Sequence, residues 1–423
     1  MSLLNYILKN QWLSPNKIKD IQNKRLRRLI KHAYYNVPYY NKLFSKNNLL
    51  PADIKTSDDL QKIPITTKDE IQKLSLDQII SKKVRIKNCK KEYTSGSTGK
   101  CLTIYLSKKD ELLRNLMDFR SLLAMGCKIF DKVALIRTYR TYVSKKFEEK
   151  ITYIFKRTIS AYLPLKDQIY YLNEFKPNII WGFPNCLKLI TKFISDNKII
   201  HLNPKVIFSS GEMLDDNTRH YLEKIFNVKV YDLYTSAELS ITAWECERHN
   251  GYHINSDSII LEITKDGKRL KYGDEGEIVC TNLINYTMPL IRYNLEDIGV
   301  LSEKLCECGR CFPILKEIKG RCDDMIILRD RTILHNHILS VYIYNIPGLF
   351  QYKLIQEDFE KFKLFYSPKE IINDNLKRYI KNNFQKHINN IHINFIGVDS
   401  IPKDKSGKLR KFISLIPKSD MNN

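Results

Sequence analysis

The residues best suited to chemistry lie in the stretch Tyr93–Lys100, whose sequence is Y-T-S-G-S-T-G-K. Its hydroxyl groups belong to Thr94, Ser95, Ser97 and Thr98, its glycines are Gly96 and Gly99, and Lys100 ends it. Glycine lets a backbone turn through positive φ and approach a ligand closely. Successive N–H groups in such a turn form an anion-binding concavity, to which hydroxyls and a lysine add donors. The stretch therefore predicts a cradle for a polyphosphate.

A polar surface loop is the alternative interpretation of the same stretch, because Ser, Thr and Gly gather in loops. The stretch is not the common P-loop, which has four residues between its glycines and Ser or Thr after the lysine. Here two residues separate the glycines, and Cys101 follows Lys100. The stretch alone leaves both interpretations open.

An α/β sheet is predicted after this stretch, because short apolar runs alternate with helical patterns between residues 100 and 235. The predicted buried strands are Val133–Ile136, Asn178–Trp181, Val206–Phe208 and Val228–Tyr231, and the predicted helices are Pro184–Ile194 and Asp215–Ile225. Ligands of such sheets bind beyond the strand ends. Polar clusters end at Glu212 after one strand and at Glu238 after the next.

The flanking regions have other patterns. Residues 1–92 are predicted to form a helical segment, with an amphipathic helix over residues 17–35 that Pro38 stops. Thr67 and Glu70 form a capping box for a short helix. Residues 252–301 show alternating β patterns, and the chain after Gly320 combines a hairpin with a helix over Glu370–His387. We therefore expect a large domain over residues 1–322 and a small α+β domain over residues 323–423.

The bulk composition narrows the class of protein. The chain has 423 residues, of which 43% are hydrophobic, and its net charge is +23. No apolar run approaches the ~18 residues of a membrane span, and the N-terminus lacks the features of a signal peptide, so we expect a cytoplasmic protein. The lysines are spread along the whole chain, so we expect no specific nucleic-acid partner. The oligomeric state stays open, a homodimer included.

A second constellation is suited to metal binding. Cys306 and Cys308 form a C-x-C pair, and Cys246, His249 and His253 precede it. Cysteine and histidine are the ligands of closed tetrahedral zinc sites. The sequence predicts a structural Zn²⁺ bound by Cys246, His253, Cys306 and Cys308. Reduced cysteines packed in a β region are the alternative.

The polar clusters, taken in order, resemble the motifs of the adenylate-forming superfamily. The matching stretches are Thr94–Lys100, Phe208–Glu212, Tyr234–Glu238, Arg292–Asp297, Gly320–Asp324 and Pro402–Lys408. Within this superfamily the chain resembles the phenylacetate–CoA ligase-like branch called CapK, which is linked to capsular polysaccharide biosynthesis. This likeness also covers Gln11–Pro15, Asn36–Tyr40 and the chain from Ile346 onward. It extends over nearly the full length, and some similar relatives carry a structural zinc at matching positions.

The resemblance implies a role for each motif residue. The β- and γ-phosphates of ATP would be held by the loop of Thr94, Ser95, Gly96, Ser97, Thr98, Gly99 and Lys100. Gly211 and Glu212 would lie against adenine, Tyr234 would stack on it, and Asp297 would bind the ribose. Glu238 would hold Mg²⁺, Arg321 would add positive charge, Asp323 would be the hinge, and Lys408 would reach the α-phosphate. The Trp181–Pro184 stretch resembles the wall of the acyl pocket, although its aromatic residues are equally suited to a core.

The implied function is an ATP-dependent ligase that activates a carboxylic acid as its acyl-adenylate. The acyl group would then pass to coenzyme A or to an amine or sugar hydroxyl. Thr235 and Ala237 replace the glycine and threonine that usually precede the magnesium-binding glutamate, and Glu296 replaces a glycine. A nucleotide-binding protein of this fold without full activity is therefore an alternative, and a basic nucleic-acid binder is another.

Overall fold

The computed structural model describes residues 3–94, 101–137, 156–197, 202–321, 325–330, 332–335, 337–344, 346–402 and 409–416. The chain forms two compact units. The first consists of residues 1–129 and 231–318, and the second consists of residues 130–230 and 319–423. The domain boundary expected at residues 322 and 323 lies outside the described residues, so it stays a prediction.

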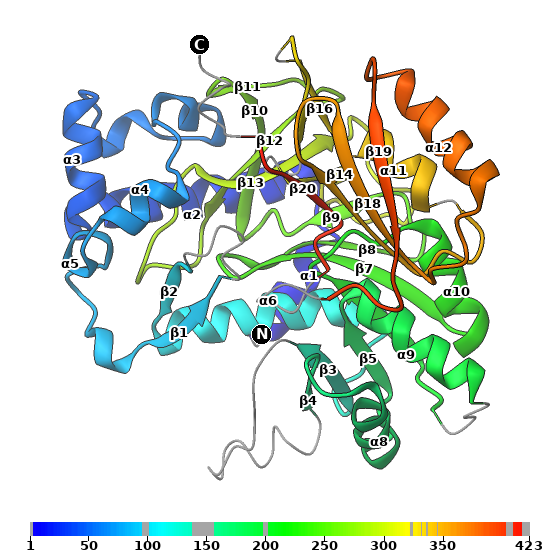
Figure 1. Cartoon of the computed structure of the whole chain (residues 1–423). Helices are drawn as coiled ribbons and strands as arrows, with labels where there is room; N and C mark the ends of the chain where they lie inside the picture. Colours follow the sequence, from blue (N-terminus) through cyan, green and yellow to red (C-terminus); the bar gives the residue numbers. More distant parts are fainter. Residues whose placement is uncertain are drawn as a thin grey trace. The chain divides into compact units, whose positions relative to one another are not determined.

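Helices at the start of the chain and a largely antiparallel sheet form the first unit (Figure 1). Its helices are α1 (Leu3–Asn10), α2 (Pro15–Asn36), α3 (Pro38–Lys46), α4 (Lys68–Lys73), α5 (Leu76–Ile79) and α6 (Lys108–Ala124), with short 3₁₀ turns at Pro51–Asp53, Ser57–Lys62 and Ile86–Asn88. The hairpin β1 (Lys90–Tyr93) and β2 (Thr103–Leu106) forms a separate two-stranded sheet.

The sheet of the first unit has the strand order β11-β10-β12-β13-β14-β9-β8-β7. Its strands are β7 (Lys229–Ser236), β8 (Ser240–Glu245), β9 (Tyr252–Ile254), β10 (Ile259–Lys265), β11 (Lys268–Arg269), β12 (Glu275–Asn282), β13 (Tyr293–Leu301) and β14 (Ile314–Arg321). Leu26, Leu29 and Ile30 of α2 are fully buried and share a core with Ile260 and Leu283. The long helix predicted from its apolar spacing is therefore confirmed, and it ends just before Pro38, which begins α3.

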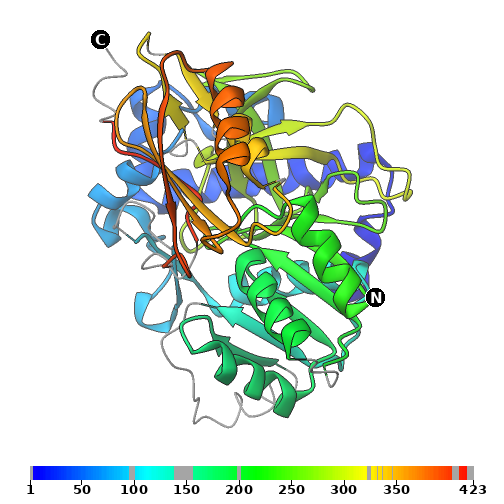
Figure 2. The same cartoon turned by 45° about the vertical axis from the view of Figure 1, so that its right-hand side comes forward.

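The second unit contains a parallel sheet and a small mixed sheet. The parallel strands have the order β6-β5-β3-β4 and are β3 (Val133–Arg137), β4 (Lys156–Ser160), β5 (Ile179–Gly182) and β6 (Val206–Ser210). Helices α8 (Leu165–Phe175), α9 (Pro184–Asp196) and α10 (Asp216–Phe226) share its core, and Figure 2 shows α9 and α10 side by side. The predicted strands and helices are all present; β4 was not predicted, because its sequence K-R-T-I-S carries only one apolar residue.

The end of the chain forms the small mixed sheet, with the order β19-β18-β17-β20. The elements here are β15 (Met325–Ile327), β16 (Ile333–His335), α11 (His337–Tyr344), β17 (Gln351–Gln356), β18 (Lys361–Ser367), α12 (Asp374–Gln385), β19 (His392–Gly397) and β20 (Phe412–Ser414). The predicted hairpin is β15–β16, and α12 lies within the predicted helical range. None of the helices among the described residues combines the length and apolar character needed to cross a membrane.

Candidate functional site

The hairpin β1–β2 carries the predicted phosphate loop. Tyr93 pairs with Thr103 at its open end. Beyond this pair, the Thr94 amide donates to the Leu102 carbonyl at 2.9 Å, and the Leu102 amide donates to Thr94 Oγ1 at 2.8 Å. The buried Thr94 side chain therefore closes the base of the loop, while Ser95–Lys100 lie outside the described residues.

Two residues that the resemblance assigns to the nucleotide are directly bonded. Tyr234, on β7, donates a 2.6 Å hydrogen bond from its hydroxyl to Oδ2 of Asp297, on β13. Burial, with the negative charge of Asp297 beside it, raises the pKa of Tyr234 well above its usual value. The phenol therefore stays protonated and keeps donating at neutral pH.

Glu238, the predicted magnesium ligand, lies in the turn between β7 and β8. Its Oε1 accepts a hydrogen bond from the Tyr293 hydroxyl at 3.3 Å. Its backbone carbonyl accepts from Asn282 Nδ2 at 3.4 Å, so the turn is anchored to β12. A carboxylate held in this way suits Mg²⁺, which proteins bind with one or two carboxylates together with substrate phosphates.

The backbone explains one departure from the family pattern. Glu296 has a φ of +62°, in the left-handed region that favours glycine. Its amide donates to the side chain of Asn294 at 2.8 Å, which supports the local turn. A glutamate therefore holds a left-handed conformation here that glycine adopts more readily.

Gly211 and Glu212 follow β6 in the second unit. Gly211 has a φ of +80°, which lets the chain turn after the strand. The Glu212 carboxylate accepts from the amide of Asn185, in the first turn of α9, at 3.3 Å and from the amide of Leu409 at 2.9 Å. Its side chain is thus tied to a helix N-terminus, where a negative charge is favoured, and to the residue that follows Lys408.

A second carboxylate, which the sequence did not indicate, also binds the segment that begins at Leu409. Asp215 Oδ2 lies 3.2 Å from Lys411 Nζ. Although burial opposes the charged form, Lys411 lowers the pKa of Asp215. Of the other predicted residues, Arg321 ends β14 and is half-buried, whereas Asp323 and Lys408 lie outside the described residues.

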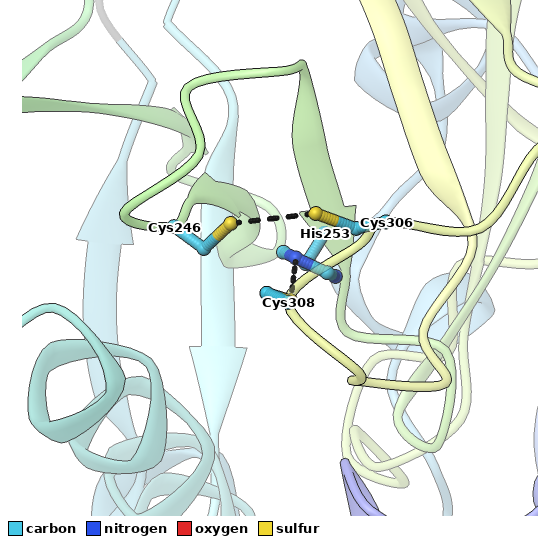
Figure 3. Close-up of side chains that lie close together, drawn as sticks. All are labelled: Cys246, His253, Cys306 and Cys308. Atoms are coloured by element: carbon cyan, nitrogen blue, oxygen red, sulfur yellow. Dashed lines mark hydrogen bonds between the residues drawn. The ribbon is translucent and has the colours of Figure 1, made fainter.

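The four predicted zinc ligands converge in the first unit (Figure 3). Cys246 follows β8, His253 lies on β9, and Cys306 and Cys308 lie between β13 and β14. The antiparallel pair β9–β14 matches His253 with Ile314, which brings these turns together. A side chain at Gly251 in the β8–β9 turn would be strained, because the φ there is +86° and a Cβ would lie 2.6 Å from Ile314 Cγ2.

The distances suit a tetrahedral metal. The four candidate ligand atoms all lie within 4.8 Å of one another. Cys246 Sγ lies 3.6 Å from Cys306 Sγ, and Cys308 Sγ lies 3.3 Å from His253 Nε2. Tetrahedral zinc places neighbouring ligand atoms roughly 3.6–3.8 Å apart. His249 and Cys311 lie outside the quartet; His249 stacks on Tyr231, and Cys311 donates to the Asn10 carbonyl.

The protonation states also suit a metal site. Burial and the nearby Arg310 charge lower the pKa of His253 to about 4, so its ring is neutral at pH 7. Burial raises the pKa of Cys246 to about 12. Against the effect of burial, hydrogen bonds from Arg310 lower the pKa of Cys308. A bound cation would displace the thiol protons, as zinc does in proteins.

Arg310, in the same loop as Cys306 and Cys308, makes hydrogen bonds and ring contacts that the sequence did not indicate. Its guanidinium bonds both carboxylate oxygens of Glu247 at 3.1–3.2 Å and Gln11 Oε1 at 3.1 Å. It also lies 4.8 Å from the Trp12 ring centroid and 5.6 Å from that of Trp244. The Cys306–Cys311 loop is therefore joined to the residues that follow α1.

Known proteins are similar in sequence to most of this chain. The chain is 29% identical to protein CapK of Staphylococcus aureus over 420 residues, which cover 95% of this chain and 90% of that protein. It is 28% identical to the phenylacetate–coenzyme A ligase of Escherichia coli K12 over 347 residues, or 77% of this chain and 76% of that ligase. No protein-family model matches the chain.

Solved structures give the fold. A 2-hydroxyisobutyryl-CoA ligase in the postadenylation state, bound to an acyl-AMP, superposes with a TM-score of 0.81 at 17% identity. The match covers 98% of this chain and 92% of that ligase. The expected α/β fold of the adenylate-forming enzymes is thereby confirmed. The chain is a homologue of CapK and of the phenylacetate–coenzyme A ligases, and it has the fold of adenylate-forming CoA ligases.

Proposed function

We propose that this chain is a cytoplasmic, ATP-dependent ligase that converts a carboxylic acid into an acyl-adenylate with release of pyrophosphate. The acyl group then passes to coenzyme A. The observation that carries the proposal is the hydrogen bond between Tyr234 and Asp297, which unites the adenine-stacking and ribose-binding candidates. The homologous phenylacetate–coenzyme A ligases support the acid-activating chemistry and the acceptor. An amine or a sugar hydroxyl is the alternative acceptor. A role in capsular or surface polysaccharide biosynthesis is what the resemblance to the CapK branch implies.

The reaction needs no covalent nucleophile on the protein, because the substrate carboxylate itself attacks the α-phosphate of ATP. The protein positions the two substrates and stabilises the charge that builds on the phosphate. Asp297 would accept hydrogen bonds from the ribose hydroxyls, with Tyr234 fixing the orientation of its carboxylate. Lys408 would donate to the α-phosphate in the adenylation step. Mg²⁺ at Glu238 would neutralise phosphate charge.

We also propose that Cys246, His253, Cys306 and Cys308 bind one structural Zn²⁺. Support comes from the convergence of the four ligand atoms and from the neutral His253 ring. With four protein ligands the metal has no open position, so its role is to fix the β8–β9 turn against the Cys306–Cys308 loop.

Acid-dependent exchange of labelled pyrophosphate into ATP tests the main proposal. A panel of carboxylic acids should include at least one that supports exchange, and coenzyme A should then yield the matching thioester. The substitution of the usual glycine and threonine by Thr235 and Ala237 favours one other candidate, a protein that binds nucleotide without turnover. That candidate predicts ATP binding with no exchange for any acid.

A further inference from the structure

Two tyrosine hydroxyls bind carboxylates reciprocally between the β7 and β13 segments of the chain. Tyr234, on β7, donates to Asp297, on β13. Tyr293, the first residue of β13, donates to Glu238, in the turn that follows β7. Each carboxylate lies four residues after the tyrosine of its own segment. The carboxylate proposed for ribose and the one proposed for Mg²⁺ are therefore each held by a tyrosine from the other segment.

The Tyr293 side chain has a fixed position from which it reaches Glu238. Its backbone is paired with Cys280 of β12 and with Thr66, whose amide and carbonyl form hydrogen bonds of 2.8 and 2.9 Å with the two residues that flank Tyr293. The ring is only 1% exposed and belongs to the same core as Leu239, the residue after Glu238. Because backbone and ring are both held, the hydroxyl is a defined donor.

Other contacts fix the backbone of the turn that carries Glu238. The Ser240 hydroxyl donates to Asp118 Oδ2, on α6, at 2.6 Å, and Asn282 binds the carbonyl of Glu238. These contacts do not set the direction of the Glu238 side chain, which has several rotatable bonds and loses conformational entropy when it is ordered. The hydrogen bond from Tyr293 acts on the carboxylate itself, so it orders the end of the side chain.

A donor of this kind is what a metal-binding carboxylate requires. Proteins bind Mg²⁺ with one or two carboxylates together with substrate phosphates. Carboxylates that bind metals are in turn hydrogen-bonded by neighbouring side chains, which orient them. A carboxylate that accepts through Oε1 has a second oxygen with which to bind a cation. A carboxylate that is ordered before the cation arrives also loses less entropy on binding.

We propose that Tyr293 is a positioning residue for magnesium, whose hydroxyl orients Glu238 to bind the Mg²⁺ that accompanies ATP. This inference rests on the proposed function, in which Glu238 holds Mg²⁺. It gives the two tyrosines separate tasks, since Tyr234 acts on the ribose through Asp297 and Tyr293 acts on the metal through Glu238. Loss of the Tyr293 hydroxyl therefore weakens the effect of Mg²⁺ on ATP binding and leaves metal-free ATP binding unchanged.

ATP binding with and without Mg²⁺ tests the inference in the absence of turnover. Calorimetry without an acid substrate gives the Kd of ATP in excess Mg²⁺ and in excess chelator, and the ratio of the two measures the effect of the metal. In Tyr293→Phe this ratio should fall roughly 10-fold, the lower end of the usual effect of removing such a partner, because the hydrogen bond is 3.3 Å long. The Kd in chelator should equal that of the wild type. The substitution removes one oxygen and keeps the buried ring.

Pyrophosphate exchange gives a second readout with an acid that supports it. In Tyr293→Phe the Mg²⁺ concentration for half-maximal exchange should rise roughly 10-fold. At saturating Mg²⁺ the kcat should return close to the wild-type value, because the metal site is then filled again. A general loss of structure would instead lower kcat at every Mg²⁺ concentration.

Two further variants show whether Tyr293 acts through the carboxylate. Glu238→Gln should abolish the effect of Mg²⁺ on ATP binding, and Tyr293→Phe should add nothing in that background, since the two residues act as one unit. Tyr252→Phe is the matched control. The Tyr252 hydroxyl, on β9 of the same sheet, donates to Asp232 Oδ2 at 2.8 Å, so this variant also loses a bond between a tyrosine and a carboxylate. It should keep the wild-type ratio.

The outcomes separate this inference from the proposed ligase function. An unchanged ratio in Tyr293→Phe, or a further loss when it is combined with Glu238→Gln, refutes the role of Tyr293 and leaves the ligase function standing. Weaker ATP binding in chelator also overturns the inference, because Tyr293 then acts on the nucleotide or the fold. The expected ratios without exchange for any acid support the inference and refute the ligase function. Absence of ATP binding by the wild-type protein refutes both.

Discussion

The hydroxyl of Tyr234 donates a 2.6 Å hydrogen bond to Asp297 Oδ2 and so joins β7 to β13, two strands that are not neighbours in the sheet. Because this bond orients the carboxylate expected to bind ribose, a change at Tyr234 should affect the nucleotide even if the aromatic ring is kept.

Tyr234→Phe should raise the KM for ATP roughly 10-fold, the usual effect of removing a hydrogen bond to a charged group. The phenyl ring can still stack on adenine, so kcat should change less than KM. Steady-state kinetics with varied ATP measure both constants. Tyr272→Phe is the control because Tyr272 is exposed. An unchanged KM in Tyr234→Phe would show that the bond to Asp297 has no part in nucleotide binding.

Lys408→Ala should slow pyrophosphate exchange by ~10²–10³-fold, because a preorganised donor to the transition state is lost. ATP affinity should stay close to that of the wild type, and transfer from a synthetic acyl-adenylate to coenzyme A should survive. Lys403→Ala and Lys405→Ala serve as controls on neighbouring lysines. Equal losses in all three variants would mean that the tail acts as diffuse positive charge.

Removal of zinc should destabilise the protein, because the proposed metal joins the β8–β9 region to the Cys306–Cys308 loop. Elemental analysis of untagged protein should find one zinc per chain, and a strong chelator should lower Tm. Cys308→Ser should lose the metal, whereas Cys311→Ser should retain it, since Cys311 lies outside the quartet. Metal-free protein with an unchanged Tm would refute the site.

Glu296→Gly should leave the free energy of unfolding unchanged or raise it by up to ~1 kcal/mol, because glycine relieves the cost of a left-handed φ. The φ of +62° at Glu296 motivates this change. Glu317→Gly, on the exposed part of β14, should lower the free energy of unfolding by ~0.5–1 kcal/mol. Denaturant unfolding of both variants gives the comparison, and a clear loss of stability in Glu296→Gly would mean that the glutamate side chain makes a stabilising contact.

Acid should destabilise the first unit through Asp257. Its carboxylate forms two hydrogen bonds with Arg120, at 2.7 and 3.0 Å, and both side chains are fully buried. Although burial alone would raise it, the Arg120 charge lowers the pKa of Asp257 below its usual value. A lowered pKa in the folded state adds stability above about pH 4, and this stability is lost as pH falls further.

Asp257→Asn should therefore cost ~3–5 kcal/mol at pH 7, because it leaves Arg120 buried without its counter-ion. Below pH 4 the difference from wild type should narrow. Asp20→Asn, at an exposed position, should unfold like wild type at every pH. Parallel pH dependence of Asp257→Asn and wild type would contradict the assignment.

Local patterns were sufficient for much of this protein. The apolar spacing of α2, the strands around Ile136, Ile180 and Phe208, and the capping box at Thr67 follow from interactions among residues near in sequence. Periodicity and capping are properties of the local chain, so the sequence by itself determined them. The convergence of Cys246, His253, Cys306 and Cys308 was predictable as well, because two Cys/His groups fall in one β-rich region.

Long-range contacts depended on the tertiary structure. The bond from Tyr234 to Asp297 spans 63 residues, and it exists only because strand order and register bring β7 and β13 within reach. Two other contacts likewise depend on how distant strands and turns pack. They are the contact of the Arg137 guanidinium with the rings of Trp181 and Phe183, and the hydrogen bond from the Leu409 amide to the Glu212 carboxylate. A sequence shows which side chains carry charge and which are apolar, but only packing decides which of them meet, because each contact is selected by the whole set of buried neighbours.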